Sequence, residues 1–281
     1  MEFIFCSDLH GNFNHYNQIF TYASQHNIHN IIIGGDLTTK SPQLKDIDLQ
    51  KQFLKDKIFP IFDNFSGHVY LIMGNDDYKA NHSFVEQSQQ LHNFTLFDSK
   101  VIPFGDYFLA GYSYVTYSPF EWKDWERRDL ASDTQANLSP ITRLQGFISD
   151  PIQNKVSCNI LDTMQEASIE EDLFTLFQNI DSKKLILVSH VPPFNTNCDC
   201  IQPSDQIVHV GSKAISKFIK EKQPLISLHG HIHETVRISG HFVEKIGNTT
   251  CASSGSDWLE DAAHILVINI DNDISINRIK L

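Results

Sequence analysis

Short apolar runs alternate with amphipathic stretches along the first third of the chain. The apolar runs are rich in aromatic and β-branched residues, which predicts three buried strands: FIFCS (3–7), NIIIGG (30–35) and HVYLIMG (68–74). The intervening stretches repeat apolar residues at helical spacing, first over 12–26 and then from a Ser41-Pro42 start to Ile58. Strands that alternate with helices predict crossover connections and a mainly parallel sheet.

The last third repeats this alternation before it changes to strands alone. KLILVSH (184–190) and LISLHGHIH (225–233) predict buried strands on either side of an amphipathic helix over 212–223. Short strand-like runs then follow one another: TVRISG, HFVEKIG, HILVINI and ISINRIKL. The fold class is therefore α/β, with parallel units early and antiparallel strands late.

The middle of the chain differs from both ends. Residues 101–114 predict two short strands, whereas residues 115–165 have little hydrophobic period. We interpret 115–165 as an insertion that lies over or beside the functional site, within one domain spanning 1–281. Its densest charge cluster, WKDWERRD (122–129), is typical of a solvated face. The alternative is a lid in which the two tryptophans stack on a base or aryl group and the arginines attract phosphate.

Composition narrows the classes of partner. The 281 residues carry a formal net charge of −12, which disfavours long nucleic acids because the surface repels their backbone. No apolar run reaches the roughly 18–20 residues of a membrane span, and Glu2 interrupts the first run, which disfavours a signal peptide. Five cysteines without framework spacing predict reduced thiols and a cytoplasmic location. Cys198 and Cys200 leave a zinc or redox role as a minor alternative.

Short polar motifs follow five of the predicted strands, and each contains a side chain that can bind a metal. These side chains are Asp8, His10, Asp36, Asn75, His190, His231 and His233. The carboxyl ends of strands form the ligand-binding edge of an open α/β sheet, so we expect these groups to converge. Mixed oxygen and imidazole ligands suit Mn²⁺, Fe, Zn²⁺ or Ni²⁺, and one carboxylate, Asp36, can bridge two cations. The pattern predicts a site for two divalent transition metal ions, with Mn²⁺ favoured.

The motifs D-x-H, G-G-D, G-N-x-D, H-x-P and G-H-x-H occur in this order over residues 3 to about 255. Together they resemble the calcineurin-like metallophosphoesterase superfamily. The stretch HVGSKAISKFIKEKQPLISLHGHIHE (209–234) resembles a prokaryotic branch of that superfamily related to Icc-type enzymes. The resemblance implies a four-layered α/β/β/α sandwich with mixed sheets. It also implies one metal held by Asp8, His10, Asp36 and His233, and a second held by Asp36, Asn75, His190 and His231. Asp77 is expected behind the ligands, where it would orient a histidine.

One position departs from the family pattern. Many members have a histidine where this chain has Asp76, and that histidine assists the leaving group or the transferred phosphoryl group. A carboxyl group acts as a general acid near neutral pH only where burial or a nearby anion favours its protonated form. As a carboxylate it would repel a phosphate dianion, so Asp76 favours a phosphodiester over a monoester. We name Asp36, Asn75, Asp76 and His190 as the catalytic candidates.

The function expected is hydrolysis of a phosphate ester by a metal-bridging hydroxide, with a small or nucleotide-like phosphodiester as the substrate. The alternatives are a phosphomonoesterase, including a protein phosphatase, and an inactive scaffold on the same fold. A DNA nuclease is disfavoured by the acidic charge. His209 lies between the two histidine motifs and is a further candidate, and exposed strands such as VEKIG leave a homo-oligomer open.

Overall fold

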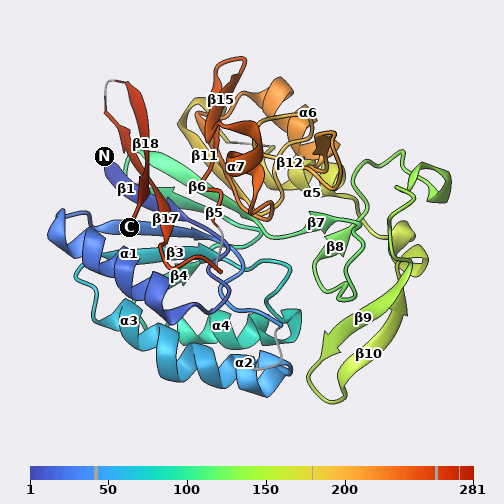
Figure 1. Cartoon of the computed structure of the whole chain (residues 1–281), viewed down its shortest axis with the longest axis horizontal. Coiled ribbons are helices and arrows are strands. Elements are labelled where there is room, and N and C mark those ends of the chain that lie inside the picture. The colour runs from blue at the N-terminus through green and yellow to red at the C-terminus, as the bar shows by residue number, and fades with distance from the viewer. Residues whose placement is uncertain (41–43, 179, 257–258, 272) are drawn as a thin grey trace.

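The computed structural model describes residues 1–40, 44–178, 180–256, 259–271 and 273–281. Its framework is a pair of six-stranded mixed sheets with helices on their outer faces (Figure 1). The expected α/β class is confirmed. Among the described residues, no helix combines the length and apolar character needed to cross a membrane.

The first sheet contains the N-terminal strands and the last two strands. Its order is β18-β17-β1-β2-β3-β4, in which β1 to β4 are parallel while β17 runs antiparallel to β1 and to β18. The bounds are Glu2–Cys6 (β1), Asn30–Gly34 (β2), His68–Ile72 (β3), Phe94–Leu96 (β4), His264–Ile270 (β17) and Ile274–Lys280 (β18).

The second sheet has a parallel centre and antiparallel edges. Its order is β15-β16-β14-β11-β6-β5, in which β6, β11, β14 and β16 are parallel. The bounds are Val101–Phe104 (β5), Tyr107–Tyr112 (β6), Leu185–Ser189 (β11), Ile226–His229 (β14), Val243–Ile246 (β15) and Thr249–Ser253 (β16). All the parallel strands predicted from the sequence are present.

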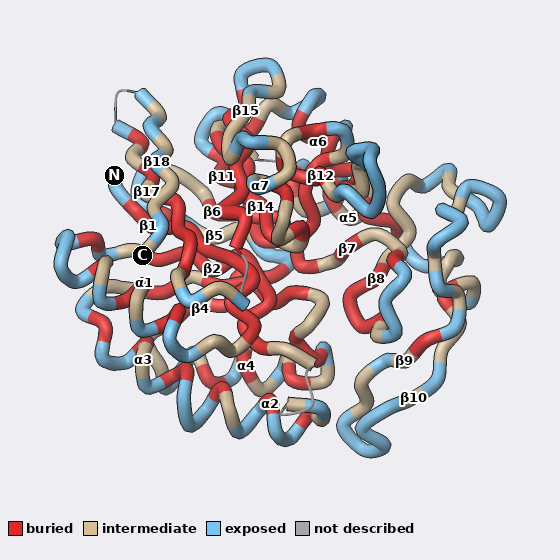
Figure 2. The backbone as a smooth tube through the Cα atoms, viewed as in Figure 1, coloured by how far each residue is buried: buried red, intermediate tan, exposed pale blue. Residues whose placement is uncertain are grey.

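Three apolar clusters establish the layers. Along β1, Ile4 and Cys6 pack against the helices outside the first sheet, while Phe3 and Phe5 pack between the two sheets. Side chains alternate across a strand, so a run that is apolar throughout buries both faces. On β11, Leu187 likewise faces the outer helices of the second sheet. Figure 2 shows this buried interior running through both sheets.

The helices cover the outer faces. The first sheet is covered by α1 (Phe13–Gln25), α2 (Ile47–Phe53), α3 (Phe59–Asp63) and α4 (His82–Ser88). The second is covered by α5 (Ile169–Leu176) and α6 (Lys213–Lys222). The predicted Ser41-Pro42 start lies outside the described residues, and α2 instead begins after Asp46, which accepts a hydrogen bond from the Leu49 backbone N–H.

One predicted strand is wrong. TVRISG forms a short helix, α7 (Thr235–Ser239), that ends at Gly240 in a left-handed conformation with φ of 75°. Its β-branched residues favour a strand, but tertiary contacts override that preference. The buried Thr235 hydroxyl donates to the Asn197 carbonyl oxygen and accepts from the Cys200 backbone N–H, which ties the turn to the neighbouring loop.

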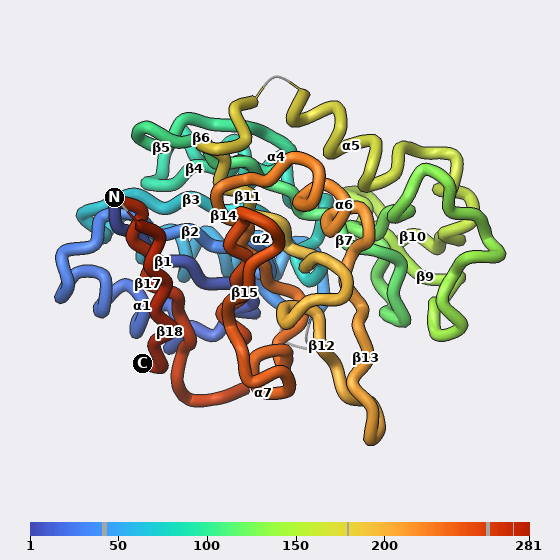
Figure 3. Tube along the Cα trace, turned by 90° about the horizontal axis from the view of Figure 1, so that it is seen from above, coloured from blue at the N-terminus to red at the C-terminus, as the bar shows by residue number. Residues whose placement is uncertain are grey.

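Two peripheral segments extend beside the sandwich. Residues 115–165 form β7 (Val115–Thr116), β8 (Glu126–Arg127) and the hairpin of β9 (Gln145–Asp150) and β10 (Asn154–Asn159). A second, smaller arm is formed by β12 (Cys200–Ile201) and β13 (Val208–His209), seen in orange in Figure 3. Both arms lie on the side where the parallel strands end, so they are placed to wall the functional site.

Candidate metal centre

The predicted ligands lie at the ends of strands from both sheets. Asp8 and His10 follow β1, Asp36 follows β2 and Asn75 follows β3, while His190 follows β11 and the last two histidines follow β14. The carboxyl ends of these strands meet where the sheets pack together. Residues more than 200 positions apart in the chain therefore come into contact.

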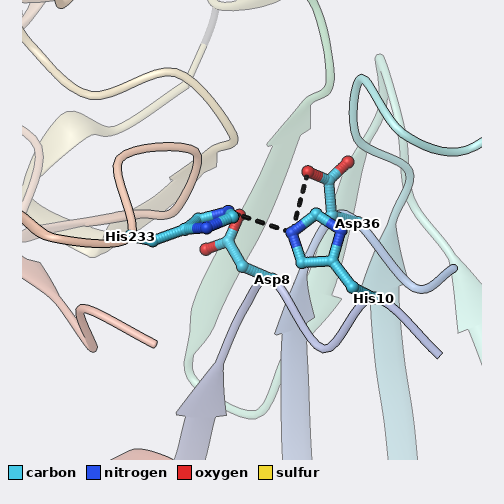
Figure 4. Close-up of side chains that lie close together, drawn as sticks. All are labelled: Asp8, His10, Asp36 and His233. Atoms are coloured by element: carbon cyan, nitrogen blue, oxygen red, sulfur yellow. Dashed lines mark hydrogen bonds and ion pairs between the residues drawn. The ribbon is translucent and has the colours of Figure 1, made fainter. Parts of the chain in front are cut away.

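The first group consists of Asp8, His10, Asp36 and His233, and one ligand atom of each lies within 4.8 Å of the others. The Nε2 atoms of His10 and His233 are 2.9 Å apart, and Asp36 Oδ2 is 3.7 Å from His10 Nε2 (Figure 4). Two carboxylates and two imidazoles thus point toward a common centre.

The second group shares Asp36 with the first. Asn75 Oδ1 lies 3.0 Å from His190 Nε2 and 2.7 Å from His231 Nδ1. Asp36 Oδ2 is 3.4 Å from His190 Nε2, so the same oxygen faces both groups. Together with the first group, these carboxylate, amide and imidazole atoms suggest a dinuclear divalent metal site in which Asp36 belongs to both groups.

The electrostatics of the cluster favour positive charge. Burial opposes ionisation of Asp36, but the His190 and His10 imidazoles outweigh it and hold its pKa well below the usual range. Burial similarly opposes ionisation of Asp8, whose pKa the His233 imidazole lowers to about 2. His10 and His190 are also buried, yet the carboxylates around them raise the pKa of each to about 9. A buried cluster of this kind attracts cations.

The ligand loops hold an unusual backbone. Asp8, His10, Asp36 and His231 have φ angles of 57°, 45°, 50° and 68°, a region that residues other than glycine rarely adopt. Hydrogen bonds across the loops fix this conformation, including His10 N–H to the Asp36 carbonyl oxygen at 2.9 Å and His231 N–H to Asp8 Oδ1 at 2.9 Å. Strain at several ligands of one site is typical of a functional centre.

Two glycines allow backbone to press against the ligands. A Cβ at Gly74 would lie 2.3 Å from Asp36 Oδ1, and a Cβ at Gly230 would lie 2.7 Å from Asp8 Oδ2. Any side chain at either position would displace a ligand carboxylate. The glycines of G-N-x-D and G-H-x-H therefore shape the site without binding a metal.

The two aspartates after Asn75 have different partners. Asp76 is partly exposed, and its Oδ2 lies 3.2 Å from His10 Nδ1. Asp77 is fully buried and accepts from the backbone N–H groups of Leu37, Thr38 and Gly74. Its described hydrogen bonds do not reach a histidine, so the expectation that Asp77 orients one is wrong. Asp77 instead joins the loop after β2 to the loop after β3.

A cavity of about 850 Å³ opens beside the ligands. His10, Asp36, Asn75, His231 and His233 form one part of its lining. Segment 116–142 and segment 194–213 supply the rest, which includes Phe120, Arg128, Phe194, His209 and Lys213. The ring of Phe120 lies edge-on to the imidazole of His231, with centroids 6.3 Å apart. The cavity joins a polar floor to a wall of mixed polar and apolar residues.

The WKDWERRD cluster is not a solvated face, and that interpretation is wrong. Trp125 is 2% exposed in the core of the first sheet, where its indole N–H donates to the Asp77 carbonyl oxygen at 2.8 Å. Lys123 and Glu126 form a buried ion pair at 3.0 Å. Trp125 is thus unavailable to stack on a substrate as the lid alternative required, and it anchors the segment to the metal centre.

The other histidines and cysteines near the predicted ligands have structural partners. His229 is buried between the Ser227 hydroxyl and the Ser189 carbonyl oxygen, so the first histidine of LISLHGHIH stabilises the strand. Burial raises the pKa of the Cys198 and Cys200 thiols, which favours neutral thiols. Asp199, between them, is fully buried and bonds His209 at 2.7 Å. Sequence reasoning missed the Asp199–His209 pair, although the D in C-D-C was its signal.

Comparison with known proteins supplies the family. A sequence model of the calcineurin-like phosphoesterases matches residues 1–235, which is most of the chain. The chain belongs to the calcineurin-like phosphoesterase family. Membership supports hydrolysis of phosphoric esters, and the aspartate–histidine cluster agrees with the divalent metal centre of a metallophosphoesterase.

Individual relatives extend this placement. The phosphoesterase chain is 38% identical over 105 residues to the uncharacterized protein MJ1162 of Methanocaldococcus jannaschii, a match that covers 37% of this chain and only 44% of that protein. A dimetal phosphatase from Danio rerio has a similar fold, with a TM-score of 0.58, 12% identity and coverage of 100% of this chain and 98% of that one. TT1561 of Thermus thermophilus aligns with a TM-score of 0.55, 14% identity and coverage of 94% and 93%. At these identities the two structures establish the shared fold.

Proposed function

We propose that this phosphoesterase uses two divalent transition metal ions to hydrolyse a phosphodiester of a small or nucleotide-like substrate. The observation that carries the proposal is the position of Asp36. Its Oδ2 atom faces His10 at 3.7 Å and His190 at 3.4 Å, so a single carboxylate lies between two groups of ligand atoms. An oxygen shared by two groups of ligand atoms favours a dinuclear hydrolase over an inactive scaffold.

Each side chain has a part in the proposal. Asp8, His10, Asp36 and His233 hold one ion, and Asp36, Asn75, His190 and His231 hold the other. When bound, two such ions supply an acidified water as nucleophile and neutralise charge on the phosphoryl oxygens. The protein holds the ligands before any substrate arrives, because hydrogen bonds from the backbone fix the loops around Asp8 and Asp36.

Asp76 has a positioning role in this proposal. Its Oδ2 atom lies beside Nδ1 of His10, and a carboxylate on the outer nitrogen of a ligand histidine fixes the ring and its tautomer. Asp76 also lines the cavity, and its carboxylate there opposes a second negative charge on the substrate. The phosphodiester preference rests on this carboxylate.

The test compares two esters on one enzyme preparation. Protein loaded with Mn²⁺ is assayed with bis-p-nitrophenyl phosphate and with p-nitrophenyl phosphate, and Asp36→Asn serves as the inactive control. We expect faster cleavage of the diester, and loss of activity in the variant. Faster cleavage of the monoester keeps the hydrolase and overturns the diester preference, in favour of a phosphomonoesterase. Metal content below two equivalents in the wild type overturns the dinuclear site.

A further inference from the structure

His209 lies on the wall of the same cavity as the proposed ligands. It ends β13 and pairs with Cys200 on β12. Its side chain is 31% exposed and contributes to the lining together with His10, His231 and His233. Among the described residues that line the cavity, His209 is the one imidazole outside the proposed ligand set.

A buried carboxylate fixes the orientation of this imidazole. Asp199 is fully buried, and its Oδ1 lies 2.7 Å from His209 Nδ1. The same oxygen accepts from the Thr196 backbone N–H at 2.9 Å, while Oδ2 accepts from the backbone N–H groups of Asn195 and Gly211, each at 3.0 Å. Backbone donors on both oxygens prevent the carboxylate from rotating. Nδ1 of His209 is therefore committed to Asp199, and Nε2 is the nitrogen left for a group in the cavity.

Three other polar side chains on the wall, Asp129, Arg128 and Tyr117, have structural partners. Asp129 accepts from the Ser212 hydroxyl and from the backbone N–H groups at the start of α6. Arg128 donates to the Ala131 carbonyl oxygen and pairs with Glu171, and the Tyr117 hydroxyl bonds Thr163. The His209 imidazole differs from these groups, because a buried carboxylate holds its Nδ1 while its Nε2 has no hydrogen-bond partner among the described residues and can donate to a group in the cavity.

We propose that His209, positioned by Asp199, is the catalytic acid that protonates the leaving-group oxygen. This inference rests on the proposed phosphoester hydrolysis. As the new bond forms between water oxygen and phosphorus, the bond to the leaving oxygen breaks and its electron pair stays on that oxygen. The proton on Nε2 passes to this oxygen, and the alcohol leaves. The attacking water releases its proton to solvent, and His209 takes one back from solvent, so the sum is ester plus water giving a phosphate product plus alcohol.

A third metal ion is the rival explanation. Asp199, Cys200 and His209 each have one ligand-type atom within 4.8 Å of the others. However, the Cys200 sulfur donates to the Thr196 carbonyl oxygen at 3.3 Å, as a neutral thiol does, and both Asp199 oxygens accept backbone hydrogen bonds. The geometry favours a proton donor, and metal content distinguishes the two explanations.

The experiment varies the leaving group. Wild type, His209→Gln, Asp199→Asn and the exposed-histidine control His241→Gln are loaded with metal and assayed on p-nitrophenyl and unsubstituted phenyl esters of the same phosphate class. A phenolate is a poorer leaving group than a p-nitrophenolate, so it depends more on a proton donor. We expect kcat/KM of His209→Gln to fall about 10²-fold more on the phenyl ester than on the p-nitrophenyl ester. Asp199→Asn should also lose more kcat/KM on the phenyl ester than on the p-nitrophenyl ester, but by a smaller factor. His241→Gln should have the kcat/KM values of the wild type on both esters.

The results that would overturn the role of His209 differ from the result that would overturn the proposed function. Equal losses on both esters, or no loss on the phenyl ester, overturn the role of His209. A third equivalent of metal in the wild type that is absent from His209→Gln also overturns it, in favour of a ligand role. If the wild type hydrolyses neither ester and matches Asp36→Asn, the proposed function itself has failed, and the inference falls with it.

Discussion

The floor and the wall of the cavity are built in different ways. The floor is the set of strand ends that carries the proposed ligands, and backbone hydrogen bonds, positive φ angles and glycines fix it. The wall, formed by segments 116–142 and 194–213, is fixed by side chains such as Trp125 and Asp129. The positions of the proposed ligands therefore depend on main-chain geometry that few substitutions tolerate, whereas the shape of the wall can change one side chain at a time.

The largest effect should come from removing one ligand of the floor. His231→Gln should lower the metal content from two equivalents to one and reduce kcat by more than about 10³-fold, because the ions supply several kcal/mol of transition-state stabilisation. His229→Gln is the matched control two residues away. It should keep both metals and lose about 1–3 kcal/mol of unfolding free energy, since it leaves buried partners unsatisfied. Metal analysis and denaturation of both variants check this, and equal metal contents would contradict the ligand assignment.

The link between floor and wall is tested at Trp125. Trp125→Ala should lower the unfolding free energy by about 3–5 kcal/mol, because it empties a buried position and removes the hydrogen bond to the Asp77 carbonyl oxygen. Trp122→Ala, at a half-buried position of the same segment, should cost clearly less. Urea denaturation of the two variants gives the comparison. Similar losses would mean that Trp125 does not anchor the segment.

The charge of the floor predicts opposite pH responses with and without metal. In metal-free protein, His10 and His190 have pKa values raised to about 9. Their protonation therefore adds to the free energy of unfolding in full below about pH 6.5, and this stabilisation is lost as pH rises through 9. The melting temperature should therefore fall over this range. Metal-loaded protein should gain stability from pH 6 to 8, because cation binding requires deprotonated ligands. Thermal melts with and without chelator check both slopes, and parallel slopes would refute the exchange of protons for cations.

The smallest effect should come from the rim of the wall. Phe120 is 53% exposed, and its ring meets the imidazole of His231 edge-on. Phe120→Ala should raise KM for aryl esters about 2- to 10-fold with little change in kcat, since an aromatic contact contributes about 0.5–1.5 kcal/mol. Ile152→Ala, at the exposed tip of the β9–β10 hairpin, should leave KM unchanged. A matching change in both variants would place Phe120 outside the binding surface.

The contrast between floor and wall also explains what could be predicted from sequence. The floor follows strands whose apolar runs are short and unmistakable, so Asp8, Asp36 and His190 could be found from motif and position. The wall has no period, and its contacts are long-range: Trp125 reaches Asp77, and Asp129 reaches α6. The local sequence gives little sign that this charged segment is buried, because Asp124 pairs with Lys40 and Arg127 pairs with Asp172, both distant in the sequence.

The anchoring of Trp125 has a consequence for how substrate enters and leaves. Its indole is bonded to the carbonyl oxygen of Asp77, two residues after Asn75, and Asp77 in turn braces the loops after β2 and β3. Segment 116–142, attached in this way, cannot move outward without disturbing the loop that holds the Asn75 side-chain amide against His190 and His231. Substrate should therefore enter and product leave by diffusion through a permanently open cavity. The association rate constant should vary with solvent viscosity only as diffusion requires. Stopped-flow traces of substrate binding should show no slow phase from closure of the cavity.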